Sequence, residues 1–149
     1  MRKPCQYNQG LFHPVNDSKY KGSRPIVYRS GLELSFYRFC DRNENVLQWG
    51  SESVVVPYIS PLDGRMHRYF TDAVLHLNVN GVTKKYLVEI KPSSQVIPPS
   101  TNTRKRRSTI LYEQVRWAQN QAKWEAARNW CTKNGYEWII LTEKDLNIK

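Results

Sequence analysis

Two acidic residues and a lysine lie in two adjacent runs that have the character of paired strands. The segment "HRYFTDAVLHLNVNGVTKKYLVEIK" runs from His67 to Lys91, with Asp72 in its first half and Glu89 in its second. Carboxylates that face each other across a strand pair repel, and a magnesium or manganese ion held between them removes that repulsion. The alternative is a solvated polar face on which acids and lysines alternate. The spacing of these residues therefore decides between a cation site and an ordinary surface.

The turn between the two runs sets which residues face each other. Asn80-Gly81 between β-rich runs predicts a hairpin with a type I′ turn. Counting outwards from this turn in equal steps brings Asp72 opposite Glu89, and Phe70 opposite Lys91. Side chains alternate along a strand, so these four project from one side of the hairpin. The other side is predicted to be a core face, formed by Tyr69, Thr71, Ala73, Leu75, Tyr86, Val88 and Ile90.

Elements before the hairpin are predicted from caps and periodicity. The sequence "SGLELSFYRFCDR" predicts a helix from Ser30, in which Ser30 and Glu33 have the spacing of a capping box. Its predicted core face consists of Leu32, Phe36, Phe39 and Cys40. The stretch "VLQWGSESVVVPY" predicts one or two strands, and Asp63-Gly64 predicts a second hairpin tip.

After the hairpin, Lys91–Arg107 is predicted to be a loop, and it ends in four consecutive basic residues. A long helix is predicted from about Ser108 to Asn134, followed by a strand in "YEWIILT". Thr142 and Asp145 have the spacing of a cap on a short final helix. The order of elements predicts an α/β domain with a mixed β-sheet flanked by helices, in the order α-β-β-β-α-β.

Composition narrows the class of protein further. The 149 residues carry a net charge of +10, which favours a polyanionic partner, above all nucleic acid. The three cysteines are widely spaced, which argues against a disulfide framework and a zinc ribbon. Without an apolar run of membrane-spanning length, we expect a soluble, cytoplasmic protein with no membrane partner. We expect a basic N-terminal arm over residues 1–25 and one domain over residues 26–149.

The motif "YFTD" followed by "VEIK" resembles the PD-(D/E)XK active site of restriction-like endonucleases, with Thr71 in place of the proline. The resemblance implies a restriction-endonuclease-like core in which Asp72, Glu89 and Lys91 are catalytic. It also implies a metal role for Glu33 on the first helix, for which the capping box is the competing explanation.

A longer stretch, from about Tyr20 to the C-terminus, resembles the head completion nucleases of tailed phages, which are similar to TnsA-type transposon endonucleases. "YRSGLE" and "NQAKWEAARNW" belong to this likeness, and Glu89 replaces the glutamine of TnsA itself. It implies a DNA endonuclease that requires Mg²⁺ (or Mn²⁺) and hydrolyses phosphodiester bonds. The implied metal ligands are Glu33, Asp72, Glu89 and the Ile90 carbonyl, with Lys91 orienting water or stabilising negative charge.

The same resemblance implies that DNA is trimmed or processed at the phage head after packaging. The implied partners are DNA and the phage portal or other head and neck proteins. The implied location is the host cytoplasm, with association with the virion head as a further expectation. Two rival interpretations stay open, namely a non-catalytic DNA-binding plug and a transposon-type endonuclease.

Several basic and polar residues are candidates for contacts with DNA. Arg29 and Ser30 precede the first helix, and Lys123 lies within an "N-x-x-K-W" pattern of the long helix. The basic cluster, defined as Arg104, Lys105, Arg106 and Arg107, could neutralise several phosphates. The alternative explanation for the basic cluster is a charged loop without a partner. For the tryptophans around Lys123, core packing is the simpler role.

Overall fold

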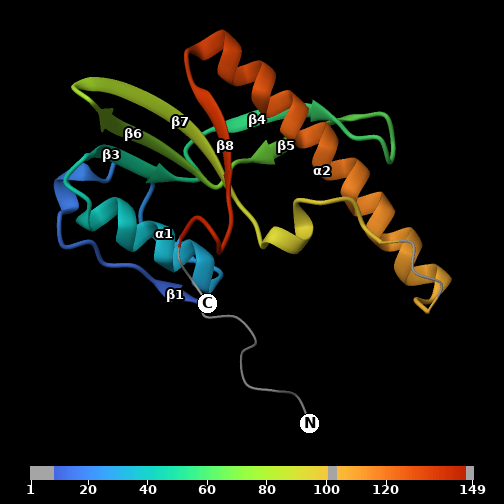
Figure 1. Cartoon of the computed structure of the whole chain (residues 1–149). Helices are drawn as coiled ribbons and strands as arrows, with labels where there is room; N and C mark the ends of the chain where they lie inside the picture. Colours follow the sequence, from blue (N-terminus) through green and yellow to red (C-terminus); the bar gives the residue numbers. More distant parts are fainter. Residues whose placement is uncertain (1–8, 101–103, 147–149) are drawn as a thin grey trace.

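A four-stranded mixed sheet with a helix on each face forms the centre of the molecule (Figure 1). The computed structural model describes residues 9–100 and 104–146 of the 149-residue chain. The strand order is β3-β6-β7-β8, with β8 parallel to β7 and the other pairs antiparallel. The strands are β3 (Val46–Ser51), β6 (Ala73–Val79), β7 (Val82–Ile90) and β8 (Glu137–Leu141). The α-β-β-β-α-β order predicted from the sequence is confirmed, with one small hairpin inserted between β3 and β6.

The β6–β7 hairpin has the predicted turn and register. Asn80 and Gly81 have φ values of 52° and 82°, both positive as a type I′ turn requires. Pairing runs from Val79 opposite Val82 at the turn to Ala73 opposite Val88 at the far end. Asp72 directly precedes this last pair, so the local turn chemistry is enough to bring it to the end of β7.

The predicted strand leading into Asp72 is broken, and this overturns two expectations. β5 (Met66–Phe70) pairs with β4 (Val55–Ile59) in a separate two-stranded sheet, where Phe70 faces Val55. The placement of Phe70 opposite Lys91 is therefore wrong. The break occurs at Thr71, whose N–H and hydroxyl both donate to the Val54 carbonyl, at 3.2 and 2.7 Å.

The break also moves Tyr69 to the other side of the sheet. Tyr69 was expected beside Ala73 and Leu75, but it packs in a different cluster with Leu87 and Trp124. Because the chain changes sheets at Thr71, the alternation of side chains between the two faces of the sheet does not continue from β6 back into β5. The core-face assignment of Tyr69 is wrong for that reason.

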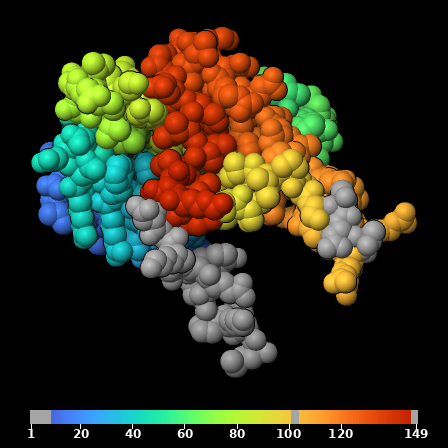
Figure 2. All heavy atoms as spheres, viewed as in Figure 1, coloured from blue at the N-terminus to red at the C-terminus, as the bar shows by residue number. Residues whose placement is uncertain are grey.

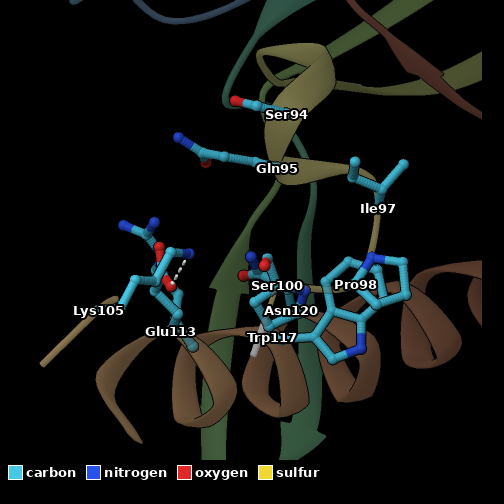
Figure 3. A pocket seen from close by; sticks show the side chains of 11 residues that line it. Ser94, Gln95, Ile97, Pro98, Ser100, Lys105, Glu113, Trp117 and Asn120 are labelled. Carbon is cyan, nitrogen blue, oxygen red and sulfur yellow. Dashed lines mark hydrogen bonds and ion pairs between the residues drawn. The ribbon is translucent and has the colours of Figure 1, made fainter. Parts of the chain in front are cut away.

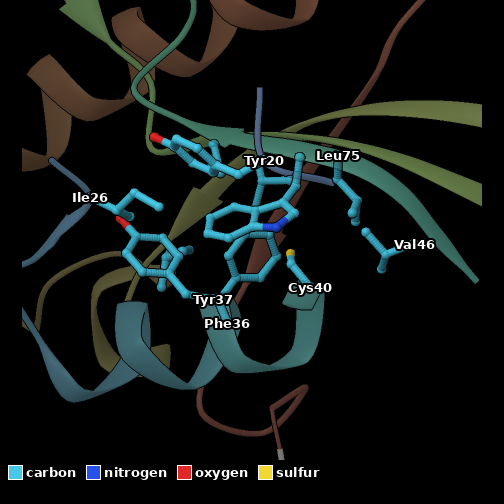
Figure 4. Packing of buried hydrophobic residues seen from close by; sticks show 11 residues of the cluster. Tyr20, Ile26, Phe36, Tyr37, Cys40, Val46 and Leu75 are labelled. Carbon is cyan, nitrogen blue, oxygen red and sulfur yellow. The ribbon is translucent and has the colours of Figure 1, made fainter. Parts of the chain in front are cut away.

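The first helix, α1 (Gly31–Arg42), packs against the sheet around Trp49. Phe36, Tyr37 and Cys40 are fully buried (Figure 4). The Tyr37 and Trp49 ring centroids are 5.2 Å apart. Phe39, predicted in the core face, is 40% exposed. That prediction is wrong because α1 presents Tyr37 to the sheet, and this turns Phe39 outwards.

Residues 9–25, the described part of the expected N-terminal arm, pack on the domain. β1 (Gly10–Leu11) pairs with β2 (Val27–Tyr28), and η1 (Asp17–Lys19) lies between them in the chain. The Asp41 carboxylate accepts the N–H groups of Val15 and Asn16, both at 2.8 Å. Tyr20 is buried in the same cluster as Trp49. Residues 1–8 of the arm lie outside the described residues.

The long helix, α2 (Arg107–Asn134), covers the opposite face of the sheet. It ends at Gly135, which has a φ of 75° and is the predicted C-terminal stop. Trp124, Ala127 and Cys131 pack against residues of β4, β5 and β7, while the N-terminal end of α2 projects beyond the sheet (Figure 1). Within the part of the chain that the structure describes, no helix is long and apolar enough to cross a bilayer.

Two short segments complete the fold. η2 (Ser93–Gln95) follows β7 and begins the path toward α2. The predicted final helix is a turn over residues 143–146. Asp145 accepts the N–H of the preceding Thr142 at 2.8 Å, as the cap spacing suggested. The rest of that prediction falls on residues 147–149, outside the described residues.

Thr71→Val tests the strand break. Valine keeps the buried shape but removes the hydroxyl that donates to Val54, while the backbone N–H bond to the same carbonyl remains. We expect the free energy of unfolding to fall by about 1 kcal/mol, measured by urea denaturation. Thr83→Val, at an exposed position on β7, is the control and should change stability by less than about 0.5 kcal/mol. Equal urea midpoints for the two variants would contradict the role given to Thr71.

Candidate active site

Asp72 and Glu89 meet at the end of the β6–β7 hairpin. Asp72 Oδ2 accepts the Ile90 N–H at 2.7 Å, so this side chain continues the hydrogen bonding of the two strands by one step. Glu89, next to Ile90, is only 4% exposed. The turn register and this hydrogen bond together place two carboxylates side by side in a largely buried position.

Glu89 has a partner on each of its two oxygens. Oε1 accepts a hydrogen bond from the Tyr69 hydroxyl, and Oε2 lies 3.6 Å from Lys91 Nζ. The Lys91 N–H donates to the Leu141 carbonyl at 3.0 Å, which fixes the backbone of this lysine to the end of β8. The acid and the lysine of "EIK" thus project together, as strand alternation predicts.

Burial and the neighbouring Glu89 carboxylate make ionisation of Asp72 unfavourable. Burial, followed by the nearby Glu89 carboxylate, raises the pKa of Asp72 well above its usual range. Two charged carboxylates this close repel each other, and a cation beside them would remove the repulsion. Both groups offer hard oxygen ligands, so the donor set fits a divalent ion such as Mg²⁺ or Mn²⁺.

Glu33 has a capping role and also acts on Asp72. The Glu33 N–H donates to Ser30 Oγ at 3.1 Å, and Glu33 Oε1 accepts the Arg29 N–H at 3.0 Å. Burial raises the pKa of Glu33, and its carboxylate in turn helps to raise the pKa of Asp72. Among residues 9–100 and 104–146, no three His, Cys, Asp or Glu side chains gather as metal ligands. The close pair is Asp72 and Glu89, with Glu33 coupled to it electrostatically.

Arg29 and Ser30 both have partners within the protein. The Arg29 guanidinium forms an ion pair with Glu52, and the Ser30 hydroxyl caps α1. Glu52 has a φ of 51°, and its N–H donates to the Asp72 carbonyl at 3.0 Å. This unusual backbone conformation ties the end of β3 to the residue that carries the central carboxylate.

Lys123 reaches the site from α2. Its Nζ lies 5.6 Å from the centroid of the Tyr69 ring and 5.9 Å from that of Tyr58. Burial and then the charge of Lys91 lower the pKa of Lys123. Two lysines from different elements therefore approach the carboxylate pair.

The basic cluster lies at the N-terminal end of α2, away from the carboxylates. Arg107 and Lys123 are separated by roughly 24 Å along the helix, at a rise of about 1.5 Å per residue. Lys105 pairs with Glu113 at 2.8 Å. The cluster comprises the three residues before α2 and its first residue, at the end of α2 that extends past the sheet (Figure 2). The fold gathers Asp72, Glu89, Lys91 and Lys123, and it leaves the basic cluster at a second, separate location.

Tyr69 is the site residue that sequence reasoning missed. Burial and the adjacent Glu89 carboxylate raise the pKa of its hydroxyl, which keeps the proton needed to donate to Glu89. The sequence holds no local signal for this contact, because it depends on the chain changing sheets at Thr71.

A restriction-endonuclease-like core with an Asp, Glu and Lys set at the end of its central hairpin defines a class of nuclease. Residues 43–143 match the family model described as TnsA-like endonuclease N terminal, and the chain belongs to this family. The matched range includes Asp72, Glu89, Lys91 and Lys123, and it begins after Glu33.

A comparison with one phage protein is more particular. The chain is 35% identical over 144 residues to the head completion nuclease of Enterobacteria phage T4, with 92% of each chain covered. This similarity extends over nearly all of both proteins.

Asp72→Asn tests the repulsion in the carboxylate pair. Asparagine can still accept the Ile90 N–H but carries no charge, so in metal-free buffer near neutral pH we expect about 1 kcal/mol of added stability. That corresponds to a rise in Tm of about 2–4 °C for a domain of this size. Because the folded state binds the Asp72 proton more tightly than the unfolded chain, wild type gains stability from this group as pH falls. The variant should lack that gain.

Asp63→Asn is the matched control, because Asp63 is an exposed aspartate whose pKa is lowered, first by the Arg65 N–H. Its substitution should not stabilise the protein. Thermal melts in EDTA over a pH series would measure both variants, and a loss of stability in Asp72→Asn would contradict the repulsion.

Tyr69→Phe tests whether the tyrosine hydroxyl orients Glu89. Loss of a hydrogen bond to a metal-binding carboxylate is expected to weaken cation affinity by about tenfold or more. Titration with Mn²⁺, followed by electron paramagnetic resonance, would measure this without any cleavage. Tyr58→Phe is the control, because the Tyr58 hydroxyl accepts from Gln119 and its ring also lies near Lys123. Equal Mn²⁺ affinity in the two variants would contradict the role of the Tyr69 hydroxyl in orienting Glu89.

Proposed function

We propose that this chain is a divalent-metal-dependent DNA endonuclease that processes DNA during completion of a phage head. The observation that carries this proposal is the joint position of Asp72, Glu89 and Lys91 at the end of β7. A protein that only bound DNA would have no use for a buried pair of carboxylates that repel each other.

The ligands proposed for Mg²⁺ or Mn²⁺ are Asp72, Glu89 and the Ile90 carbonyl, with Glu33 as the further carboxylate. When bound, the ion would lower the pKa of a water molecule and offset negative charge on the phosphate. Tyr69 would hold the Glu89 carboxylate in one orientation by its hydrogen bond. The Asp72 carboxylate would be held by the Ile90 N–H.

Lys91 is proposed as the catalytic lysine. Its ammonium group is already beside Glu89 and its backbone is fixed to β8, so the charge is aimed into the site before substrate arrives. A fixed positive charge stabilises negative charge that develops on the phosphate or orients the attacking water. Lys123, on the facing helix, would contact a phosphate of the same strand.

DNA binding would extend along α2 to the basic cluster. A distance of roughly 24 Å along the helix corresponds to about seven base pairs of duplex at 3.4 Å each. Arg29 would contribute if a phosphate displaced Glu52 from its guanidinium, and Ser30 would offer its hydroxyl at the start of α1. The net charge of +10 supports this electrostatic role.

The biological setting is proposed from the similarity to a protein named head completion nuclease. The substrate would be DNA at the phage head after packaging, and portal or other head and neck proteins would be partners. The chain would act in the host cytoplasm or in association with the virion head.

Cleavage by Asp72→Ala and Lys91→Ala variants tests the proposed reaction. Supercoiled, branched and single-stranded DNA would be incubated with each protein in Mg²⁺ and in EDTA. We expect wild type to cut only with the metal, and each variant to bind DNA but cut at least about 100-fold more slowly. Asp63→Ala and Lys84→Ala, at exposed positions of β-hairpins, are the controls and should cut like wild type. Binding without cleavage of any substrate by wild type in Mg²⁺ or Mn²⁺ would favour the DNA-binding plug.

A further inference from the structure

A cavity lies between the candidate active site and the basic cluster, lined by residues close in sequence to Lys91 and Lys123 at one side and by Lys105 at the other. Its volume is about 350 Å³, and it opens to solvent between residues 94–100, Lys105 and the N-terminal half of α2 (Figure 3). This is near the lower end of the roughly 300–1,000 Å³ that small-molecule sites occupy. The cavity therefore has room for one nucleotide-sized group and none for a duplex.

Both walls of this cavity contain residues that lie close in sequence to a lysine of the candidate site. One wall starts with Ser94 and Gln95, a short distance along the chain from Lys91. The other wall includes Trp117 and Asn120, which precede Lys123 at successive helical spacings on α2. A DNA strand whose phosphate lies between the two lysines would have its next nucleotide at the mouth of the cavity.

The lining changes in chemistry from one end to the other. Pro98 and Trp117 lie toward one end, and Lys105 and Glu113 toward the other (Figure 3). Trp117 is held edge-on by Trp124, with ring centroids 6.2 Å apart and an interplanar angle of 86°. An aromatic face is a platform on which an unpaired base stacks.

Polar groups are available for the rest of a nucleotide. Asn120 is 7% exposed and brings an amide, which can both donate and accept, to the cavity wall. The lining also has two positive side chains, Lys105 and Arg116, against the one carboxylate of Glu113. The amide of Asn120 would complement a base edge, and the charges of Lys105 and Arg116 would complement a phosphate.

The wall formed by residues 94–100 is held in place at its start. The Ser93 N–H donates to Glu143 Oε1 at 2.8 Å, and the Gln95 N–H donates to the Pro92 carbonyl at 2.9 Å. The Ser93 hydroxyl also donates to Glu143. The cavity is thus built on a segment fixed to the residues that directly follow β8.

We propose that this cavity binds one deoxynucleotide of the DNA strand beside the scissile phosphate, with its base unpaired and stacked on Trp117. Arg116 and Lys105 would face the phosphate of that nucleotide, and Asn120 and Gln95 would face the base edge. The inference rests on the proposed nuclease function, and it adds the path by which the DNA strand leaves the candidate active site. It follows that an unpaired nucleotide at this position strengthens binding.

Binding in EDTA tests this proposal without cleavage. Fluorescence anisotropy would compare a blunt duplex with the same duplex carrying a short single-stranded extension. We expect wild type to bind the extended duplex about tenfold more tightly, within the range that stacking of one base supplies. Trp117→Leu and Gln95→Ala should lose most of this difference, and Trp117→Phe should keep it.

Arg116→Ala and Arg128→Ala form a matched pair of exposed arginines on α2, of which only Arg116 lines the cavity. Arg116→Ala should reduce the difference between the two DNAs, and Arg128→Ala should leave it unchanged. Photocrosslinking with iododeoxyuridine in the extension should label the tryptic peptide from Trp117 to Lys123, which contains one tryptophan.

Equal affinity of wild type for both DNAs, or an equal effect of the cavity substitutions on both, would overturn the proposal. Plasmid cleavage by the same wild-type preparation in Mg²⁺ separates this failure from failure of the proposed function. Cleavage without a binding preference for the extended duplex would support the nuclease function and contradict the nucleotide site.

Discussion

The repulsion between Asp72 and Glu89 is the constraint around which the rest of the site is arranged. Two buried carboxylates can stay close only if neighbouring groups compensate for the lost solvation. The Ile90 N–H, the Tyr69 hydroxyl and the Lys91 ammonium supply that compensation, and they come from two strands and the segment that follows β7. The compensation is incomplete, since the pKa of Asp72 remains raised. An incompletely balanced negative site is what a divalent cation requires.

The transfer of the chain between two sheets makes this arrangement possible. If β5 continued into β6 as one strand, Tyr69 would lie on the α1 side, away from Glu89. Thr71 instead binds Val54 with both its N–H and its hydroxyl, and β5 leaves to pair with β4. Tyr69 then enters from the α2 side, where Lys123 lies over its ring. Threonine at this position, where the family motif has proline, supplies two donors that proline would lack.

What could be predicted from the sequence depended on short-range chemistry. Asn80-Gly81 determines its own turn and therefore the register that brings Asp72 to Glu89. Ser30 caps the start of α1 by a local hydrogen bond, and Gly135 ends α2 with a left-handed backbone. Both helix boundaries were predicted. The position of Tyr69 could not be predicted, because alternation fails wherever a chain changes sheets. Likewise, Phe39 is exposed because packing against Trp49 selects which face of α1 is buried, and periodicity alone leaves that choice open.

The parallel strand β8 has a consequence for the order in which the molecule is made. Lys91 is bonded through its backbone to Leu141, and Ser93 to Glu143, fifty residues later in the chain. Parallel pairing of β7 with β8 must wait until the whole of α2 has been synthesised, because α2 is the crossover between them. On the ribosome, the residues of the hairpin that brings the two carboxylates together are synthesised early, yet the lysine beside them can be anchored only when the last strand docks. A nascent chain therefore carries the two acids of the candidate site well before the geometry around them is complete.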